Sequence, residues 1–182
     1  MTRFIAVWVF LVLLPLYLAV ALAIFIEDGV PVFFTQKRVG INYSFFYIFK
    51  FRSMKKNTPN VATHLLTNPD QYLLKIGKFI RRTSLDELPQ LINILLGTMS
   101  IVGPRPALYN QYDLIQLRKE CGVDILKPGL TGLAQIYGRD ELNNEYKCKF
   151  DKEYLENISF SIDIKIIFLT IIRVIKGSGV SH

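Results

Sequence analysis

The sequence has few of the residues on which disulfide scaffolds and metal sites are built. Its 182 residues include only two cysteines and two histidines. Cys121 and Cys148 are far apart and form no Cys-x-x-Cys pattern, and His64 and His182 are isolated. This scarcity argues against a disulfide-stapled fold and against a zinc site, and it favours free thiols in a reducing compartment.

Acidic residues are also scarce, and the chain has no internal repeat, low-complexity tract or linker. Lys and Arg total 22 against 15 Asp and Glu, for a net charge of +7. This balance suits nucleic acid, an anionic lipid surface or a phosphorylated substrate. Hydrophobic residues make up 51% of the chain and charged residues 20%, so we expect a small water-facing domain joined to membrane-embedded segments.

The longest stretch that lacks charge runs from Phe4 to Ile26. As one helix it would be about 34 Å long, enough to cross a bilayer. A cleaved signal peptide fits poorly, because the run is too long and Glu27-Asp28 follows it. Pro15 divides the run and costs a helix interior about 3 kcal/mol. Two structures fit: a kinked spanning helix, which the residues alone favour slightly, and a re-entrant helix that returns to the side it entered.

A β-hairpin is expected next, with strands over Val30–Val39 and Tyr43–Met54 around a turn at Gly40–Asn42. In the second strand, alternate aromatic residues share one face, while Lys50 and Arg52 share the other. Those two cations either belong to an ordinary solvated face or bind phosphate.

A helix start is indicated where Ser84 and Glu87 are spaced as a capping box. An apolar stripe follows, and Gly97 ends the helix. Pro89 lies one turn into this helix and lacks a donor, which indicates a tight or irregular first turn.

Beyond this helix the pattern predicts a helix over 108–121, a Gly- and Thr-rich loop over 127–139, and an apolar helix over 160–176. The last segment is short for a membrane span and is interrupted by four charged residues: Asp163, Lys165, Arg173 and Lys176. It is therefore either a helix in the membrane interface or a buried core helix.

The residues that indicate chemistry are the adjacent carboxylates Asp86 and Glu87. Helix capping alone would explain them, but cations surround them in short motif-like stretches: Lys50, Arg52, Arg81, Arg82, Arg105 and Arg139. Two prolines fix the backbone around Arg105. Two carboxylates can hold Mg²⁺, and several cations can hold a diphosphate. The inventory favours phosphoryl transfer, in which a carboxylate can also act as the nucleophile.

The chain resembles the monotopic phosphoglycosyl transferases, also called the bacterial sugar transferase family. Five stretches match the family pattern in order: Phe33–Gly40, Phe49–Met54, Arg81–Gln90, Gly103–Pro106 and Lys127–Arg139. The third, Arg-Arg-Thr-Ser-Leu-Asp-Glu-Leu-Pro-Gln, is highly specific. With the segments around Pro15 and Asp163, the likeness covers nearly the whole chain.

The resemblance implies an α+β fold: a small, mainly helical domain with a β-hairpin, a re-entrant membrane helix and interfacial amphipathic helices. Residues 1–28 would form the re-entrant helix, broken at Pro15, which reverses the preference for a spanning helix. Residues 29–182 would form the catalytic domain, with an interfacial helix near 160–176. The enzyme would be monotopic in the bacterial inner membrane, with its catalytic domain on the cytoplasmic face. Leu14 stands where the family commonly has Ser.

The resemblance also implies a UDP-sugar donor, undecaprenyl phosphate as acceptor, UMP as leaving group and Mg²⁺ as cofactor. Asp86 matches the family nucleophile and Glu87 its acidic partner, and both would hold the metal. Five residues match phosphate- or substrate-binding positions: Lys50, Arg82, Arg105, Gln135 and Arg139.

The reaction would be the first membrane step of bacterial glycoconjugate assembly and would pass through a covalent aspartyl-phosphosugar. In its length and its Gly177–Ser181 ending, the chain resembles the short, catalytic-domain members of the family that use diacetylated bacillosamine. Those members are the diacetylbacillosamine-phosphate transferases of N-glycosylation pathways. The alternatives are the same chemistry on a membrane-spanning anchor and a non-catalytic scaffold that binds anionic lipid. Nucleic acid is disfavoured, because the basic residues form no single run or helix face.

Overall fold

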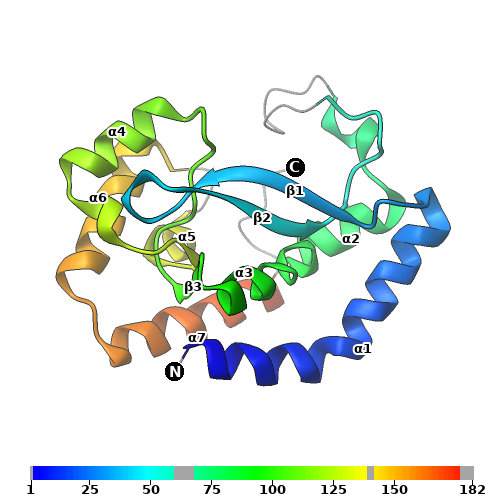
Figure 1. The fold of residues 1–182 in the computed structure, drawn as a ribbon, viewed down its shortest axis with the longest axis horizontal. Helices are drawn as coiled ribbons and strands as arrows, with labels where there is room; N and C mark the ends of the chain where they lie inside the picture. Colours follow the sequence, from blue (N-terminus) through cyan, green and yellow to red (C-terminus); the bar gives the residue numbers. More distant parts are fainter. Residues whose placement is uncertain (1, 60–67, 139–141, 177–182) are drawn as a thin grey trace.

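The computed structural model describes residues 2–59, 68–138 and 142–176. The expectations for Arg139, for His64 and His182, and for the Gly177–Ser181 ending fall outside these residues. Within the described part, seven α-helices surround a two-stranded antiparallel hairpin and a short parallel strand pair (Figure 1). The predicted α+β class is confirmed.

The N-terminal helix α1 (Thr2–Asp28) is helical throughout, with Pro15 inside it. Its axis nevertheless bends between the two halves, so the second half rises away from the first (Figure 1). Ala6–Asp28 is long and apolar enough to cross a membrane, and large side chains such as Val12 and Ile26 are three-quarters exposed. A proline inside a helix accounts for such a bend, because it lacks a backbone donor. Both a kinked spanning helix and a re-entrant one contain such a bend, so the re-entrant topology stays a prediction.

The hairpin pairs β1 (Phe33–Val39) with β2 (Phe45–Phe51), from Phe33 opposite Phe51 to Val39 opposite Phe45. A 3₁₀ turn, η1 (Ile41–Tyr43), joins the strands where the sequence placed the turn. The burial of β2 excludes a solvated face for Lys50. Phe46 and Ile48, on the same face as Lys50, are buried, whereas the alternate aromatics Phe45 and Tyr47 are exposed.

Helix α2 (Lys75–Arg82) was not predicted, and it leads into a 3₁₀ turn, η4 (Leu85–Glu87), and then into α3 (Gln90–Leu96). The predicted capping box is wrong. Ser84 adopts a left-handed backbone with a φ of 55° and makes no capping hydrogen bond, and α3 begins only after Pro89. The irregular entry and the helix end at Gly97, which has a φ of 82°, are confirmed.

A second sheet, of two short parallel strands, joins β3 (Ser100–Val102) to β4 (Gly129–Thr131). The expected loop over 127–139 therefore contains a strand and also helix α5 (Leu133–Tyr137). Glycine is required where these segments cross. A Cβ at Gly129 or Gly132 would overlap the backbone of Gly103. Two of the sequence motifs are thus in backbone contact.

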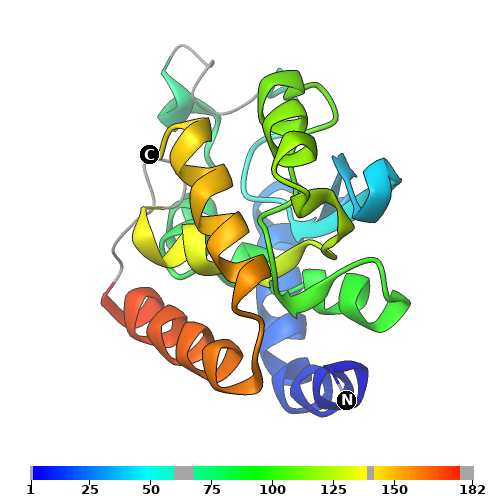
Figure 2. The same cartoon turned by 90° about the vertical axis from the view of Figure 1, so that its left-hand side faces the viewer.

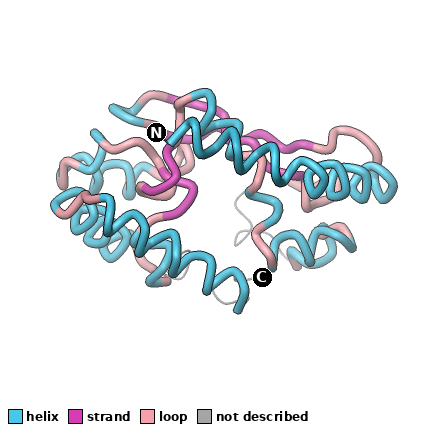
Figure 3. The backbone as a smooth tube through the Cα atoms, turned by 90° about the horizontal axis from the view of Figure 1, so that it is seen from below, coloured by secondary structure: helices cyan, strands magenta, loops and turns pink. Residues whose placement is uncertain are grey.

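The remaining helices form the other side of the molecule. They are α4 (Tyr112–Glu120), α6 (Asn144–Glu156) and α7 (Phe160–Lys176), and 3₁₀ turns lie at η3 (Pro69–Tyr72) and η5 (Val123–Ile125). The first is shorter than predicted, the second was missed, and the third has the predicted bounds. Helix α7 and the first half of α1 lie on the same side of the molecule (Figures 1 and 2), which Figure 3 views directly.

Candidate active site

Two cationic side chains from separate motifs meet at the carboxylate of Glu87, which belongs to a third motif. Lys50 Nζ lies 2.9 Å from Glu87 Oε1, and Arg105 Nη1 lies 3.2 Å from the same oxygen. The side chains of Lys50 and Glu87 are only 15% and 10% exposed. Residues of the second, third and fourth motifs are therefore in direct contact.

Strand β2 brings Lys50 to this cluster because the buried amide of Asn93 fixes β2 to α3. Asn93 Oδ1 accepts from the Phe49 amide at 3.0 Å, and Asn93 Nδ2 donates to the Tyr47 carbonyl at 2.8 Å. An amide suits this position, since it satisfies a donor and an acceptor of the same strand. Sequence analysis missed Asn93, which lies among apolar residues and resembles a break in their stripe.

The turn that carries Arg105 is held through its own carbonyl oxygens by two further arginines. Arg118 Nη1 donates to the Arg105 carbonyl at 2.9 Å, and Arg38 Nη1 donates to the Pro106 carbonyl at 3.0 Å. Arg118 is itself paired with buried Asp151, at 2.9 Å through Nε and 2.6 Å through Nη2. These contacts position the guanidinium of Arg105, and no motif marked Arg118 or Asp151.

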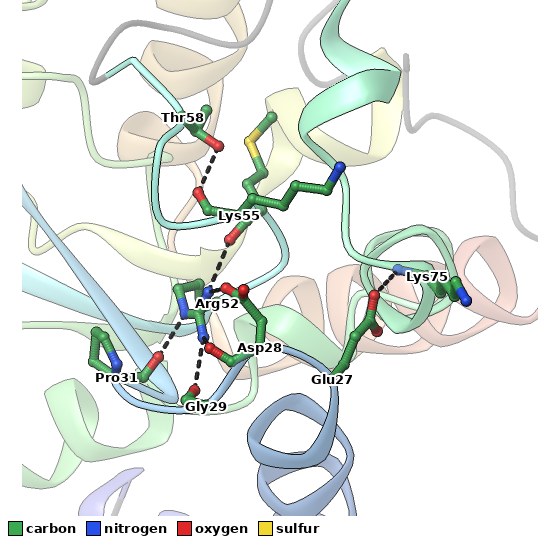
Figure 4. Close-up of polar contacts among 9 residues, drawn as sticks. Glu27, Asp28, Gly29, Pro31, Arg52, Lys55, Thr58 and Lys75 are labelled. Carbon is green, nitrogen blue, oxygen red and sulfur yellow. Dashed lines mark hydrogen bonds and ion pairs between the residues drawn. The ribbon is translucent and has the colours of Figure 1, made fainter.

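Arg52 has a structural role, so its suggested phosphate-binding role is not supported. Its guanidinium forms an ion pair with Asp28 and donates to the carbonyls of Pro31 at 2.5 Å and Gly29 at 2.8 Å (Figure 4). It is 6% exposed. Arg52 thus fastens the end of α1 to the hairpin.

The end of α1 has a second attachment, in which Glu27 caps α2. Its carboxylate accepts from the Lys75 amide at 2.6 Å (Figure 4). It also accepts from the Ile76 amide at 3.1 Å. Farther back in α1, the Tyr17 hydroxyl donates to the carbonyl of Leu88, the residue that follows Glu87. Helix α1 is therefore connected directly to the segment that carries Asp86 and Glu87.

A pocket of about 340 Å³ opens beside the charged cluster. Arg82, Glu87, Arg105 and Gln135, all predicted site residues, line it. The Gln135 amide oxygen is buried and has no hydrogen-bond partner among the described residues, so it can accept from a bound ligand. The fifth predicted binding residue, Arg139, lies outside the described part of the chain.

Asp86 is 9% exposed and does not line the pocket, although the residues on both sides of it, Leu85 and Glu87, do. Both carboxylates act on the charge of Lys50. Burial lowers the pKa of the Lys50 ammonium, and the negative charges of Glu87 and Asp86 offset part of that effect. The pair lies in a 3₁₀ turn that ends three residues before α3 begins, so the dipole of that helix acts on it only weakly.

The donor set fits Mg²⁺ only if a substrate also contributes oxygen atoms. Asp86 and Glu87 are adjacent hard oxygen donors, and Glu87 Oε1 already contacts two cations. The described residues contain no group of three or more His, Cys, Asp or Glu placed to hold an ion. Mg²⁺ commonly binds one or two carboxylates together with substrate phosphates and water, so the two carboxylates fit that mode.

Comparison with known proteins gives the family. The model of the bacterial sugar transferase family matches residues 1–177. The chain belongs to the bacterial sugar transferase family. This confirms the resemblance drawn from the five motifs, and it makes the chain a transferase.

Three relatives illustrate the range of the family. The UDP-glucose:undecaprenyl-phosphate glucose-1-phosphate transferase of Escherichia coli K12 is 42% identical over 180 residues, which cover 92% of this chain and 38% of that protein. The undecaprenyl-phosphate galactose phosphotransferase of Salmonella typhimurium is 38% identical over 172 residues, 84% of this chain and 35% of that protein. The uncharacterized sugar transferase EpsL of Bacillus subtilis is 40% identical over 158 residues, 86% of this chain and 76% of that protein.

The chain thus spans little more than a third of the first two enzymes, and three quarters of the third. The names of the first two relatives include undecaprenyl phosphate, a lipid phosphate. Together with the exposed apolar surface of α1, they indicate that this sugar transferase is associated with a membrane.

Proposed function

We propose that this chain transfers a sugar 1-phosphate from a UDP-sugar to undecaprenyl phosphate, which yields a sugar diphospholipid and UMP. The observation that carries the proposal is the contact of Lys50 and Arg105 with Glu87 at the wall of a pocket, in a member of the sugar transferase family. A scaffold that only binds anionic lipid needs diffuse positive charge. Such a scaffold does not require a largely buried lysine paired with a carboxylate.

Asp86 is the proposed nucleophile. One of its carboxylate oxygens bonds to the phosphorus next to the sugar, and the bond from that phosphorus to the bridging oxygen breaks. UMP leaves with the bridging oxygen and its electron pair. A phosphate oxygen of the acceptor then bonds to the same phosphorus, and the carboxylate of Asp86 is released.

The surrounding side chains bind and orient the substrates in this proposal. Arg82 and Arg105 present guanidinium groups to phosphate oxygens at the pocket wall, where a planar fork gives two-pronged contact. Lys50 keeps Glu87 in place, and the free acceptor of Gln135 meets a donor of the ligand. Arg139 is proposed to complete the phosphate-binding set.

Asp86 and Glu87 are proposed to hold Mg²⁺ together with the diphosphate of the donor. When bound, the ion would neutralise charge on the phosphate oxygens. The chain is further proposed to act at the cytoplasmic face of the bacterial inner membrane, with lipid around α1 and with both ends of that helix on one side.

The test uses detergent-purified protein, undecaprenyl phosphate and a panel of UDP-sugars, with UMP release as the readout. The panel includes UDP-glucose, UDP-galactose, UDP-N-acetylgalactosamine and UDP-diacetylbacillosamine. We expect release with at least one donor and its loss on chelation of Mg²⁺. No release with any donor in the presence of both acceptor and Mg²⁺ would contradict the proposal.

The nucleophile is tested by Asp86→Asn, which is nearly isosteric but is a poor nucleophile and a weak metal ligand. Turnover should fall by orders of magnitude, while the exposed control Asp113→Asn should retain it. Without acceptor, the unaltered protein should release about one equivalent of UMP, and mass spectrometry should place a sugar phosphate on the Asp86 peptide. UMP release only with both substrates, and no adduct, would favour a direct displacement and leave Asp86 as a metal ligand or base.

A further inference from the structure

The pocket beside Glu87 has one wall that the proposed nucleotide chemistry does not require. Helix α7 contributes five lining residues, of which three are aliphatic: Ile167, Thr170, Ile171, Arg173 and Val174. Facing them are further aliphatic side chains, among them Leu85, Leu88 and Ile136. A nucleoside diphosphate is polar along its whole length and does not need a cleft of this composition.

The wall is held in a fixed position. The Thr170 and Thr131 hydroxyls lie 2.6 Å apart in a hydrogen bond, which fixes α7 to β4. On its inner face, Ile166 is 1% exposed within a core cluster of the domain. The pocket is therefore built into the fold, and its α7 side does not depend on a movable loop.

The opposite face of α7 is an exposed apolar stripe. Phe160, Ile164, Phe168 and Ile171 recur at helical spacing and are 68%, 49%, 62% and 53% exposed. Ile171 belongs both to the stripe and to the pocket wall, and exposed Val174 lines the pocket as well. The pocket thus borders directly on an apolar surface, on the side of the molecule where the first half of α1 also lies (Figure 2).

Arg173 supplies a positive charge within this apolar wall. Among the described residues it makes no hydrogen bond or ion pair, whereas Arg105 across the pocket contacts Glu87. The pocket therefore combines three arginines, at positions 82, 105 and 173, with aliphatic walls that continue onto an exposed apolar surface. A ligand that matches both the arginines and the aliphatic walls is an amphiphile with a phosphate at one end and an aliphatic chain at the other.

We propose that the α7 wall binds the acceptor, with its phosphate against Arg173 and its first isoprenoid units along Ile167, Ile171 and Val174. The chain of the acceptor then passes from the bilayer into the pocket along the stripe without crossing water. The sugar nucleotide enters from the polar side of the pocket. The inference rests on the proposed function only for the identity of the acceptor.

The test compares Arg173→Ala with Lys165→Ala, a matched loss of positive charge. Lys165 is exposed and does not line the pocket, and at 100° per residue it lies on the flank of α7 away from Ile167 and Val174. We expect Arg173→Ala to raise the KM for undecaprenyl phosphate about ten- to hundredfold. Arg173→Lys should recover part of the loss. The KM for the UDP-sugar should stay within about twofold of that of the unaltered protein in Arg173→Ala and in Lys165→Ala.

A second measurement does not depend on turnover. Native mass spectrometry of the purified chain with undecaprenyl phosphate and with undecaprenol should show retention of the phosphate form, and this should weaken in Arg173→Ala but not in Lys165→Ala. Failure of the proposed function would leave this binding difference in place. A raised KM for the UDP-sugar, an equal effect of Lys165→Ala, or retention of undecaprenol as strong as that of the phosphate would overturn the assignment.

Discussion

Replacement of Asp151 by Asn tests the scaffold that holds the Arg105 turn. Asp151 is 1% exposed and Arg118 9%, and the two are joined at 2.9 Å and 2.6 Å. Asn keeps the shape and one acceptor but removes the charge, which leaves a buried guanidinium without a counter-ion. Breaking a buried pair from one side costs about 3–5 kcal/mol, and we expect the lower end because the amide oxygen still accepts a hydrogen bond.

A loss of about 3 kcal/mol is a large share of the 5–15 kcal/mol that stabilises a typical domain. At about 2–4 °C per kcal/mol for a chain of this length, the unfolding midpoint should fall by about 6–12 °C. Turnover should also decrease at temperatures below the new midpoint, because Arg118 would hold the Arg105 carbonyl less firmly.

A thiol-reactive fluorogenic dye can follow this unfolding. Cys148 is 3% exposed and lies on α6, the helix that carries Asp151, so the dye reports the opening of this region in a Cys121→Ser background. Glu156→Gln on the same helix is the matched control. Its partner Lys152 is 3.9 Å away, and both side chains are more than half exposed, so the change should stay below about 0.5 kcal/mol.

Asp151→Asn would contradict this expectation if it lowered the free energy of unfolding by less than about 1 kcal/mol while Glu156→Gln behaved as expected. Arg118 would then have found another partner, and the buried pair would not be what fixes the turn.

Three further predictions concern the guanidinium of Arg105, the bend in α1 and the burial of Cys148. Arg105→Lys keeps the charge but loses the planar fork, so turnover should fall about ten- to hundredfold with the unfolding midpoint unchanged; near-normal turnover would mean that only charge matters there. Pro15→Ala removes the cause of the bend in α1, so a larger fraction of the molecules should span the membrane. In intact cells, an impermeant thiol reagent should then label a cysteine placed at residue 2 more strongly, while a cysteine placed at the exposed position of Asn57 stays protected. Labelling at residue 2 without the Pro15 substitution would refute a re-entrant helix. Burial raises the pKa of the Cys148 thiol to about 12, so iodoacetamide at pH 8 should modify this thiol only on unfolding; fast alkylation of the folded protein would contradict this. The contribution of the buried neutral thiol to stability should be present below about pH 8.5 and be lost as the pH rises toward 12.

Local pattern alone determined much of the fold. The uncharged run around Pro15, the helix end at Gly97 and the bounds of α7 follow from hydropathy and from the backbone preferences of proline and glycine, which act within a few residues. The family motifs likewise marked Glu87 and Arg105, which meet in the structure. Local pattern missed α2, α5 and the strand pair of β3 and β4, which are short or depend on a partner far along the chain. It also missed α6, a 13-residue helix made mostly of polar and charged residues.

Only the tertiary structure decided which charges belong to the scaffold. Lys50 lies on β2 and Arg52 comes directly after that strand, yet Lys50 meets Glu87 and Arg52 meets Asp28. Nothing in the strand pattern separates them, because the choice depends on where two distant carboxylates fall. The same holds for Arg118, whose partner Asp151 lies 33 residues away on another helix. Sequence spacing reports neighbours on one element, whereas the burial and pairing of a charge depend on which elements pack together.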